Sequence, residues 1–344
     1  MLVHDKSIWI VSREYAGIAE AGGVKNVTAS LAETLVKKGF DVKVFIPEYG
    51  CTELNCIQNY TSIESFEEIS ITDTLYAVHY ASAFSASVPI IFIKNPIFSS
   101  KGAVYTYTSE EEKRNPSHQR GIGHTDSQIM NALFQKAVLE YALLHNTAPA
   151  VIHCQDAAAS MLPVYAREDI RSKNFFNKTS FIVTIHNAGP GYHHSFSSID
   201  EAYRVTNLPH HVLMYGLNEA VVEPFLLTSK YAVLTTVSPW YAQEITDPSY
   251  PYTDGLSYVF ALRGIKVEGI LNAIDYDRYD PSEITKSLLC SPFNPLLDDF
   301  EGRKKVRICL LQKLHSGIAG HSDHEGRISA IEQFGTLHPS STPV

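Results

Sequence analysis

The 344-residue sequence has few features of membrane, secreted or nucleic-acid-binding proteins. No run approaches the roughly 18 apolar residues that a membrane helix needs, and only a short apolar stretch precedes Ser12, so we expect neither a membrane span nor a signal peptide. The five cysteines are widely spread and form no CxxC pair, which favours a reducing compartment over a disulfide framework. A net charge of −9 argues against a nucleic-acid partner. These absences predict a cytoplasmic protein.

The residues that are present predict a mixed α/β core. Hydrophobic residues make up 44% of the chain, without low-complexity bias, and the length allows one large domain with an appendage or two domains. A strand at residues 8–11, a helix at 24–38 and a strand at 41–46 form a β-loop-α-β unit, which predicts a parallel, Rossmann-like sheet. Further on, we expect strands at 75–81, 88–93, 150–154, 180–185, 232–237 and 266–271, helices at 157–167 and 219–231, a weak helix at 303–314, and a solvated loop at 105–124.

The most informative stretch is IHNAGPG at residues 185–191, directly after an apolar strand. It places the imidazole of His186 and the carboxamide of Asn187 at the carboxyl end of a buried strand. The small residues of this turn let a ligand approach the backbone closely, and ligands of open α/β sheets bind at that edge. The alternative reading of His186 is a packed, hydrogen-bonded histidine.

A second loop of small residues, AGG at 21–23, lies between the first strand and the first helix. A diglycine at a helix N-terminus exposes backbone N–H groups and the positive end of the helix dipole, which suits a pyrophosphate. Alternatively, Gly22 and Gly23 form only a tight turn. Because both loops follow strands of one parallel sheet, we expect them to share one crevice.

Five segments together resemble, in order and spacing, the N-terminal half of bacterial glycogen synthases and plant starch synthases. They are EAGGVKNV at 20–27, HCQD at 153–156, TIHN at 184–187, TVSPWYAQEI at 236–245 and GILNAID at 269–275, and the resemblance covers residues 7–313. It implies the N-terminal half of a GT-B glycosyltransferase, in which two Rossmann-like domains face a deep cleft. The implied reaction transfers glucose from ADP-glucose to the 4-OH of an α-1,4-glucan acceptor with retention of configuration, without a metal or other cofactor.

The resemblance also implies roles for individual residues. His186 corresponds to the family's catalytic-site histidine, beside the sugar where positive charge develops, and Asn187 follows it in the turn. Asp156 matches the aspartate of an HxHDW-type strand end, where a carboxylate orients sugar hydroxyls; capping the next helix is the alternative. Asn272 and the diglycine are expected to bind the nucleotide sugar. The alternative for Asn272 is that it simply ends a strand.

The sequence departs from the family pattern at four positions, one of which is Ala273, where the GILNGID-like segment has a glycine. Glu20 stands where the KxGG motif has a lysine, and a carboxylate repels a diphosphate. Either Lys25 or another cation replaces that lysine, or nucleotide binding is weaker. Gln155 replaces a histidine and Ala157 a tryptophan at the HxHDW-type strand end, which bears on contacts with the acceptor or the sugar.

Family character ends near Leu314, and we expect the family's C-terminal nucleotide-binding domain to be missing from this sequence. We expect a catalytic domain at residues 1–314 and a non-homologous, poorly ordered tail at 315–344, the pattern that a frameshift or truncation produces. One interpretation is a glucan-extending synthase, and a second is a catalytically dead glucan-binding fragment. A Rossmann-like oxidoreductase ranks below both, because no GxGxxG fingerprint follows the first strand.

Two further groups of residues remain open to interpretation. The histidine pairs at 193–194 and 210–211 do not predict a metal site, because adjacent side chains of an extended segment point in opposite directions and no cysteine or carboxylate cluster completes a ligand set. Four aromatic residues either stack on sugar rings or serve as ordinary packing: Tyr105, Tyr107, Tyr192 and Trp240.

Overall fold

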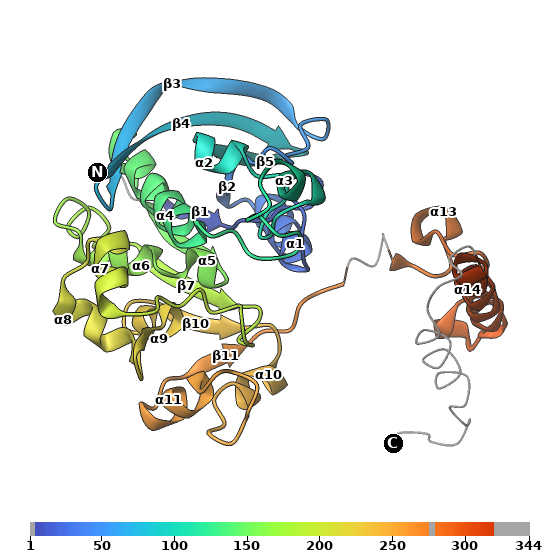
Figure 1. Ribbon diagram of the computed structural model, residues 1–344. Helices are drawn as coiled ribbons and strands as arrows, with labels where there is room; N and C mark the ends of the chain where they lie inside the picture. The colour runs from blue at the N-terminus through green and yellow to red at the C-terminus, as the bar shows by residue number, and fades with distance from the viewer. Residues whose placement is uncertain (1–3, 275–278, 320–344) are drawn as a thin grey trace. The chain divides into compact units, whose positions relative to one another are not determined.

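The computed structural model describes residues 4–274 and 279–319 (Figure 1). The chain divides into two compact units, Met1–Ala273 and Ile274–Val344. All predicted site residues lie in the first unit. The predicted domain boundary after Leu314 falls within a helix of the second unit, and most of the predicted tail lies outside the described residues, so both stay predictions.

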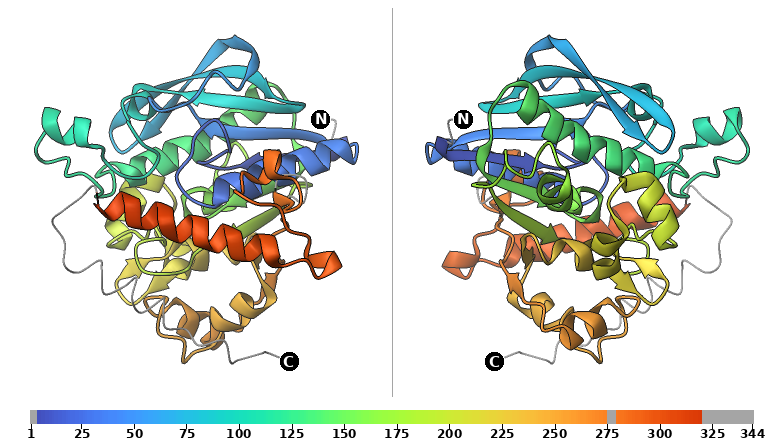
Figure 2. Two further views of the ribbon diagram at one scale, coloured as in Figure 1. Left: turned by 90° about the vertical axis from the view of Figure 1, so that its right-hand side faces the viewer. Right: turned by 90° about the vertical axis from the view of Figure 1, so that its left-hand side faces the viewer.

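A nine-stranded sheet organises the first unit, in the order β11-β10-β7-β6-β1-β2-β5-β4-β3. The strands from β11 to β5 pair in parallel, and β4 and β3 add antiparallel at one edge, which confirms the predicted α/β fold with a largely parallel sheet. In both views of Figure 2, the β3–β4 pair lies at one end of the sheet and α10 and α11 at the other. The strands are β1 (His4–Val11), β2 (Asp41–Pro47), β3 (Gln58–Ile71), β4 (Thr74–Ser85), β5 (Val88–Lys94), β6 (Pro149–Gln155), β7 (Ser180–Ile185), β10 (Val233–Thr236) and β11 (Val267–Gly269).

The apolar run of β1 places this strand inside the core. Trp9, Ile10 and Val11 are each at most 1% exposed, as expected for a parallel strand covered on both faces. The ring of Trp9 packs 4.7 Å from Phe45 of β2 and 5.8 Å from Tyr141 of the long helix α4. In the sheet β1 lies between β2 and β6, so the chain crosses over on opposite sides of it. Such a switch point opens a crevice at the carboxyl ends of the strands.

Helices and a short hairpin connect the strands. The predicted first helix is present as α1, which buries Val24, Thr28, Ala29 and Ala32. Within the described residues, no helix is both long and apolar enough to cross a membrane. The helices of the first unit are α1 (Val24–Lys37), α2 (Pro96–Ser99), α3 (Ser109–Arg114), α4 (Ser127–Leu144), α5 (Ala157–Ser160), α6 (Leu162–Glu168), α7 (Ile199–Thr206), α8 (His210–Leu213), α9 (Pro224–Thr228), α10 (Pro239–Glu244) and α11 (Leu256–Leu262), and the hairpin pairs β8 (Leu217–Asn218) with β9 (Val221–Val222).

Three local predictions were wrong. Residues 105–124 are not only a loop, because Thr108 and Glu111 form a capping box that starts α3. The single helix predicted at 219–231 is instead the β8–β9 hairpin followed by α9, which begins at Pro224 behind the N-cap Glu223. The helix predicted at 157–167 is broken into α5 and α6, with Pro163 in the first turn of α6. Strand β3 has no counterpart in the prediction.

The second unit is small in its described part. It contains the helices α13 (Ile284–Ser287) and α14 (Glu301–Ala319), joined through a 3-10 turn at Pro295–Leu297. Helix α14 covers and extends the weak helix predicted at 303–314.

Candidate active site

A cavity of about 730 Å³ opens at the carboxyl ends of the parallel strands, within the size range of small-molecule sites. Its lining comes from the loops that follow β1, β6, β7, β10 and β11, together with the segment at 105–127. The structure thus brings together both small-residue loops, as the sequence predicts. Of the seven predicted site residues, six line this cavity: Gly22, Gly23, Asp156, His186, Asn187 and Asn272.

His186 lies directly after β7, half-buried in the cavity wall. Its Nε2 donates a hydrogen bond to Oε1 of Gln155 at 2.8 Å, so the residue that replaces the family histidine fixes one side of the ring. Burial lowers the pKa of His186 to about 4, which keeps the imidazole neutral at neutral pH. The two readings of this residue are therefore compatible, since His186 is both hydrogen-bonded and part of the cavity.

Asp156 has the most unusual backbone of the site. Its φ of 64° and ψ of 178° lie in a region that residues with a side chain rarely adopt, and such conformations concentrate at functional sites. Although Asp156 precedes α5, no capping hydrogen bond from its side chain is found in the described structure. Instead, Oδ1 accepts the backbone N–H of His186 at 3.4 Å. Burial raises the pKa of this carboxyl to about 7, against the effect of the backbone N–H groups around it.

The turn after His186 is held by side chains. Oδ1 of Asn187 accepts the N–H of Gly189 at 2.8 Å, and a Cβ at position 189 would approach that oxygen to 2.9 Å, which explains the glycine. The N–H of Ala188 donates to the Tyr241 hydroxyl at 2.9 Å. Tyr241 belongs to the TVSPWYAQEI segment, so this motif supports the turn from α10.

The diglycine loop differs from the simplest expectation. The N–H groups of Ala21 and Gly22 donate to Oε2 of Glu14 at 3.2 and 2.6 Å, so they are already used within the protein. Gly23 is the N-cap of α1, and among the described residues no side chain caps this helix. The N-terminal end of α1, at Gly23 and Val24, lines the cavity together with the Glu14 carboxylate, which already lies near the positive end of the helix dipole.

Glu20 is the one predicted site residue outside the cavity lining. Its carboxylate accepts the N–H of Gly17 at 2.8 Å and pairs with Lys25 Nζ at 2.9 Å. Lys25 is thus engaged by Glu20 itself, which argues against Lys25 as the substitute for the family lysine. The role of Glu20 toward a nucleotide stays a prediction.

Sequence reasoning missed Arg13 and Glu14, which also line the cavity. Arg13 is 2% exposed. Its Nε donates a hydrogen bond to the Tyr49 hydroxyl at 2.8 Å, and its Nη1 donates to Oδ1 of Asn131 at 2.9 Å. The guanidinium carbon lies 4.9 Å from the centre of the Tyr105 ring. Its side-chain partners are neutral, so Arg13 adds positive charge to the site. Two charged residues directly after a buried strand are the signal that would have identified them.

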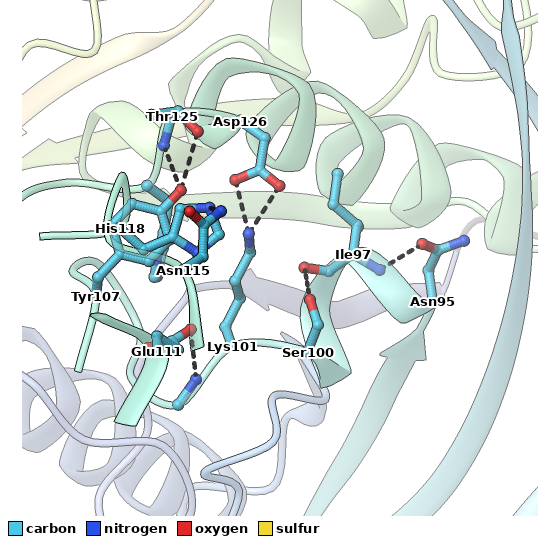
Figure 3. A network of polar contacts seen from close by, with 12 residues as sticks. Asn95, Ile97, Ser100, Lys101, Tyr107, Glu111, Asn115, His118, Thr125 and Asp126 are labelled. Atoms are coloured by element: carbon cyan, nitrogen blue, oxygen red, sulfur yellow. Dashed lines mark hydrogen bonds and ion pairs between the residues drawn. The ribbon is translucent and has the colours of Figure 1, made fainter. Parts of the chain in front are cut away.

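The segment at 105–127 is held against the site by a polar network (Figure 3). Lys101 Nζ contacts both carboxylate oxygens of Asp126 at 2.7 and 2.8 Å, and the ring of Tyr107 stacks on His118 with centroids 4.1 Å apart. Tyr107 therefore serves as packing. In contrast, Tyr105 and Tyr192 line the cavity, and Trp240 is 70% exposed on α10.

The histidine pairs have other partners than a metal. His193 contacts Glu223 and a backbone carbonyl, and His210 lies 3.9 Å from Asp200. In the described residues, no group of three or more His, Cys, Asp or Glu side chains is arranged to hold a metal ion.

Comparisons with known proteins agree with the geometry. The model of the starch synthase catalytic domain matches residues 7–261. Glycogen synthase 2 of Geobacter sulfurreducens is 29% identical over 283 residues, covering 80% of this chain and 54% of that protein. Glycogen synthase of Thermodesulfovibrio yellowstonii is also 29% identical over 283 residues, covering 80% of this chain and 55% of that protein. The chain therefore spans about half the length of the curated relatives that it matches.

A solved structure shows the same fold. The catalytic domain of starch synthase IV from Arabidopsis thaliana, bound to ADP and acarbose, superposes with a TM-score of 0.68 at 24% identity, over 90% of this chain and 59% of that one. The family match includes the loops that follow β1 and β7. It therefore argues against the interpretation of the chain as a Rossmann-like oxidoreductase. The chain belongs to the starch synthase catalytic domain family of glycosyltransferases.

Proposed function

We propose that this chain forms the acceptor side of a glucosyltransferase that extends an α-1,4-glucan from ADP-glucose with retention of configuration. The observation that carries the proposal is the single cavity shared by six predicted site residues, in a chain of the starch synthase family. The names of the relatives, and the ADP and acarbose bound to starch synthase IV, support a nucleotide donor and a glucan acceptor. The five free thiols support the proposed reducing, cytoplasmic location.

The chemistry of the cavity suits this reaction. The N-terminus of α1 and the buried guanidinium of Arg13 favour a diphosphate leaving group that gains negative charge. A neutral His186 does not repel the positive charge that develops at the anomeric carbon. Asp156, whose pKa is raised to about 7, can either donate a hydrogen bond to a sugar hydroxyl or accept one near neutral pH. We assign to Asn187 and Asn272 hydrogen bonds to the sugar or the nucleotide.

A second candidate function is glucan binding without transfer. The specific observation that favours it is the carboxylate of Glu20 beside the diglycine loop, where the family motif has a lysine. The two candidates share the glucan and differ in the use of the donor.

Two measurements on the purified chain separate them. The first is transfer of radiolabelled glucose from ADP-glucose to glycogen, with UDP-glucose as the comparison donor, and the second is co-sedimentation with glycogen. Transfer together with co-sedimentation supports the synthase, and co-sedimentation alone supports the second candidate. Absence of both contradicts the proposal. In a reconstituted full-length enzyme, His186→Ala should lower transfer by orders of magnitude without unfolding the chain, and His211→Gln on the exposed surface is the matched control.

A further inference from the structure

A buried pair, His193 and Glu223, holds the turn after His186 from behind. His193 is 6% exposed and Glu223 1%. Nδ1 of His193 lies 2.8 Å from Oε2 of Glu223, and Nε2 lies 2.7 Å from the carbonyl oxygen of Ala188. Neither residue is part of the cavity lining described above, and the proposed chemistry uses neither of them.

The hydrogen bonds determine the protonation state of this pair. A carbonyl oxygen only accepts, so Nε2 of His193 carries a proton. Glu223 Oε2 also accepts the Ser195 hydroxyl at 2.8 Å, and Oε1 accepts the N–H of Phe225 at 3.2 Å, so Glu223 is an acceptor at both oxygens. An ionised carboxylate fits these acceptor roles, and Nδ1 of His193 then donates to it, so we assign the pair as a histidinium and a carboxylate.

The charged groups around the pair favour this state. Burial lowers the pKa of His193, but the hydrogen bond and charge of Glu223, the Ala188 carbonyl and the charge of Asp254 together raise it above its ordinary value. The neighbouring His194 has its pKa lowered to about 4 by burial and by the charges of Arg13 and His193, so it stays neutral. Buried ion pairs contribute little net stability when intact, but removal of one partner is costly.

Ala188 is held at both of its backbone polar atoms. Its carbonyl accepts from His193, and its N–H donates to the Tyr241 hydroxyl on α10. Because Ala188 directly follows Asn187, the orientation of the two peptide groups that flank Ala188 sets the direction in which the turn leaves β7. Glu223 follows β9 and caps α9, so the pair ties the turn to a separate part of the fold.

We propose that His193, as a histidinium paired with Glu223, is a positioning residue that holds the Ala188 peptide and thereby the turn bearing His186 and Asn187. Its effect on ligand binding rests on the proposed function. When His193 loses a proton, either the Ala188 carbonyl loses its donor or the buried carboxylate loses its partner. The stabilisation is therefore present at low pH and is lost as the pH rises through the raised pKa of His193.

The test is an NMR titration of the full chain, labelled with ¹⁵N in histidine and backbone. We expect both ring nitrogens of His193 to be protonated at pH 6.5, and the amide signals of Asn187 and Ala188 to shift with the same midpoint as His193. Glu223→Gln keeps the size of the side chain and should move that midpoint below the ordinary value for histidine. His193→Gln should remove the pH dependence of the two amide signals, and His211→Gln should leave it intact.

The titration of the wild-type chain decides the proposal even if both variants fail to fold. An unprotonated Nδ1 at pH 6.5, or amide signals of Asn187 and Ala188 that ignore the His193 midpoint, would overturn it. Maltoheptaose affinity supplies the functional readout: it should fall by about tenfold in His193→Gln, as expected for residues coupled through direct contact. If the wild-type chain binds no glucan while the titration behaves as expected, the proposed function fails and the positioning of the turn stands. If glucan binds and the titration does not, the positioning inference fails alone.

Discussion

Replacing Asp156 by asparagine should make the stability of the protein less dependent on pH. Burial raises the pKa of this carboxyl from its ordinary value of 3.8 to about 7. The folded state therefore keeps the proton over a pH range in which the unfolded chain has lost it. The wild-type protein loses stability as the pH rises from about 4 through about 7, which amounts to about 2–3 kcal/mol between pH 5 and pH 8. Asparagine keeps the shape of the side chain and cannot ionise.

The assay is urea unfolding at pH 5 and pH 8, followed by the fluorescence of Trp9, which is 1% exposed in the core. We expect Asp156→Asn to gain about 2–3 kcal/mol relative to wild type between these two pH values. Asp73→Asn, in the exposed turn between β3 and β4, is the matched control and should follow the wild-type pH dependence. An identical pH dependence in wild type and Asp156→Asn would refute the reasoning about the buried carboxyl.

Three further predictions concern the region of the diglycine loop and the end of β11. Glu20→Lys removes a carboxylate and adds a cation beside the diglycine loop, so it should tighten ADP-glucose binding by up to about tenfold. Calorimetry measures this affinity. Unchanged or weaker binding would mean that this position is not equivalent to the family lysine. Gly269→Ala should cost more than about 2 kcal/mol of unfolding free energy, because its Cβ would come within 2.3 Å of the Ser238 carbonyl oxygen. Gly23→Ala, whose Cβ meets nothing described within 4 Å, should change stability by less than about 1 kcal/mol in the same urea unfolding experiment.

The sequence predicted the centre of the fold better than its periphery. Parallel strands such as β1 and β7 contain apolar runs, and the connection after each of them includes a loop of small residues, so their position and the crevice at their ends follow from local pattern and sheet topology. Long-range pairing is harder, since β3 is mostly exposed and carries little periodic signal. The charged run at 110–114 favours a solvated loop, although the capping box of Thr108 and Glu111 that starts α3 is visible in the sequence.

Within the site, the residues that line the cavity were easier to predict than the residues that hold them in place. His186 and Asp156 follow from their places after buried strands. The hydrogen bond between Glu14 and the diglycine loop depends on how the chain turns after β1. The hydrogen bond between Gln155 and His186 joins the ends of two neighbouring strands, β6 and β7. The pairing of His193 with Glu223 joins residues 30 positions apart and depends on the hairpin that the sequence did not predict.

In the proposed function, the loops after β1, β6 and β7 form a sugar-binding wall. The most direct test maps maltoheptaose on the ¹⁵N-labelled chain by its effect on amide signals. We predict changes at Asp156, His186, Asn187 and the diglycine loop, and their loss in His186→Ala. Changes confined to another surface, such as the groove beside β4 lined by His79 and Lys94, would contradict the claim, as would the absence of any binding.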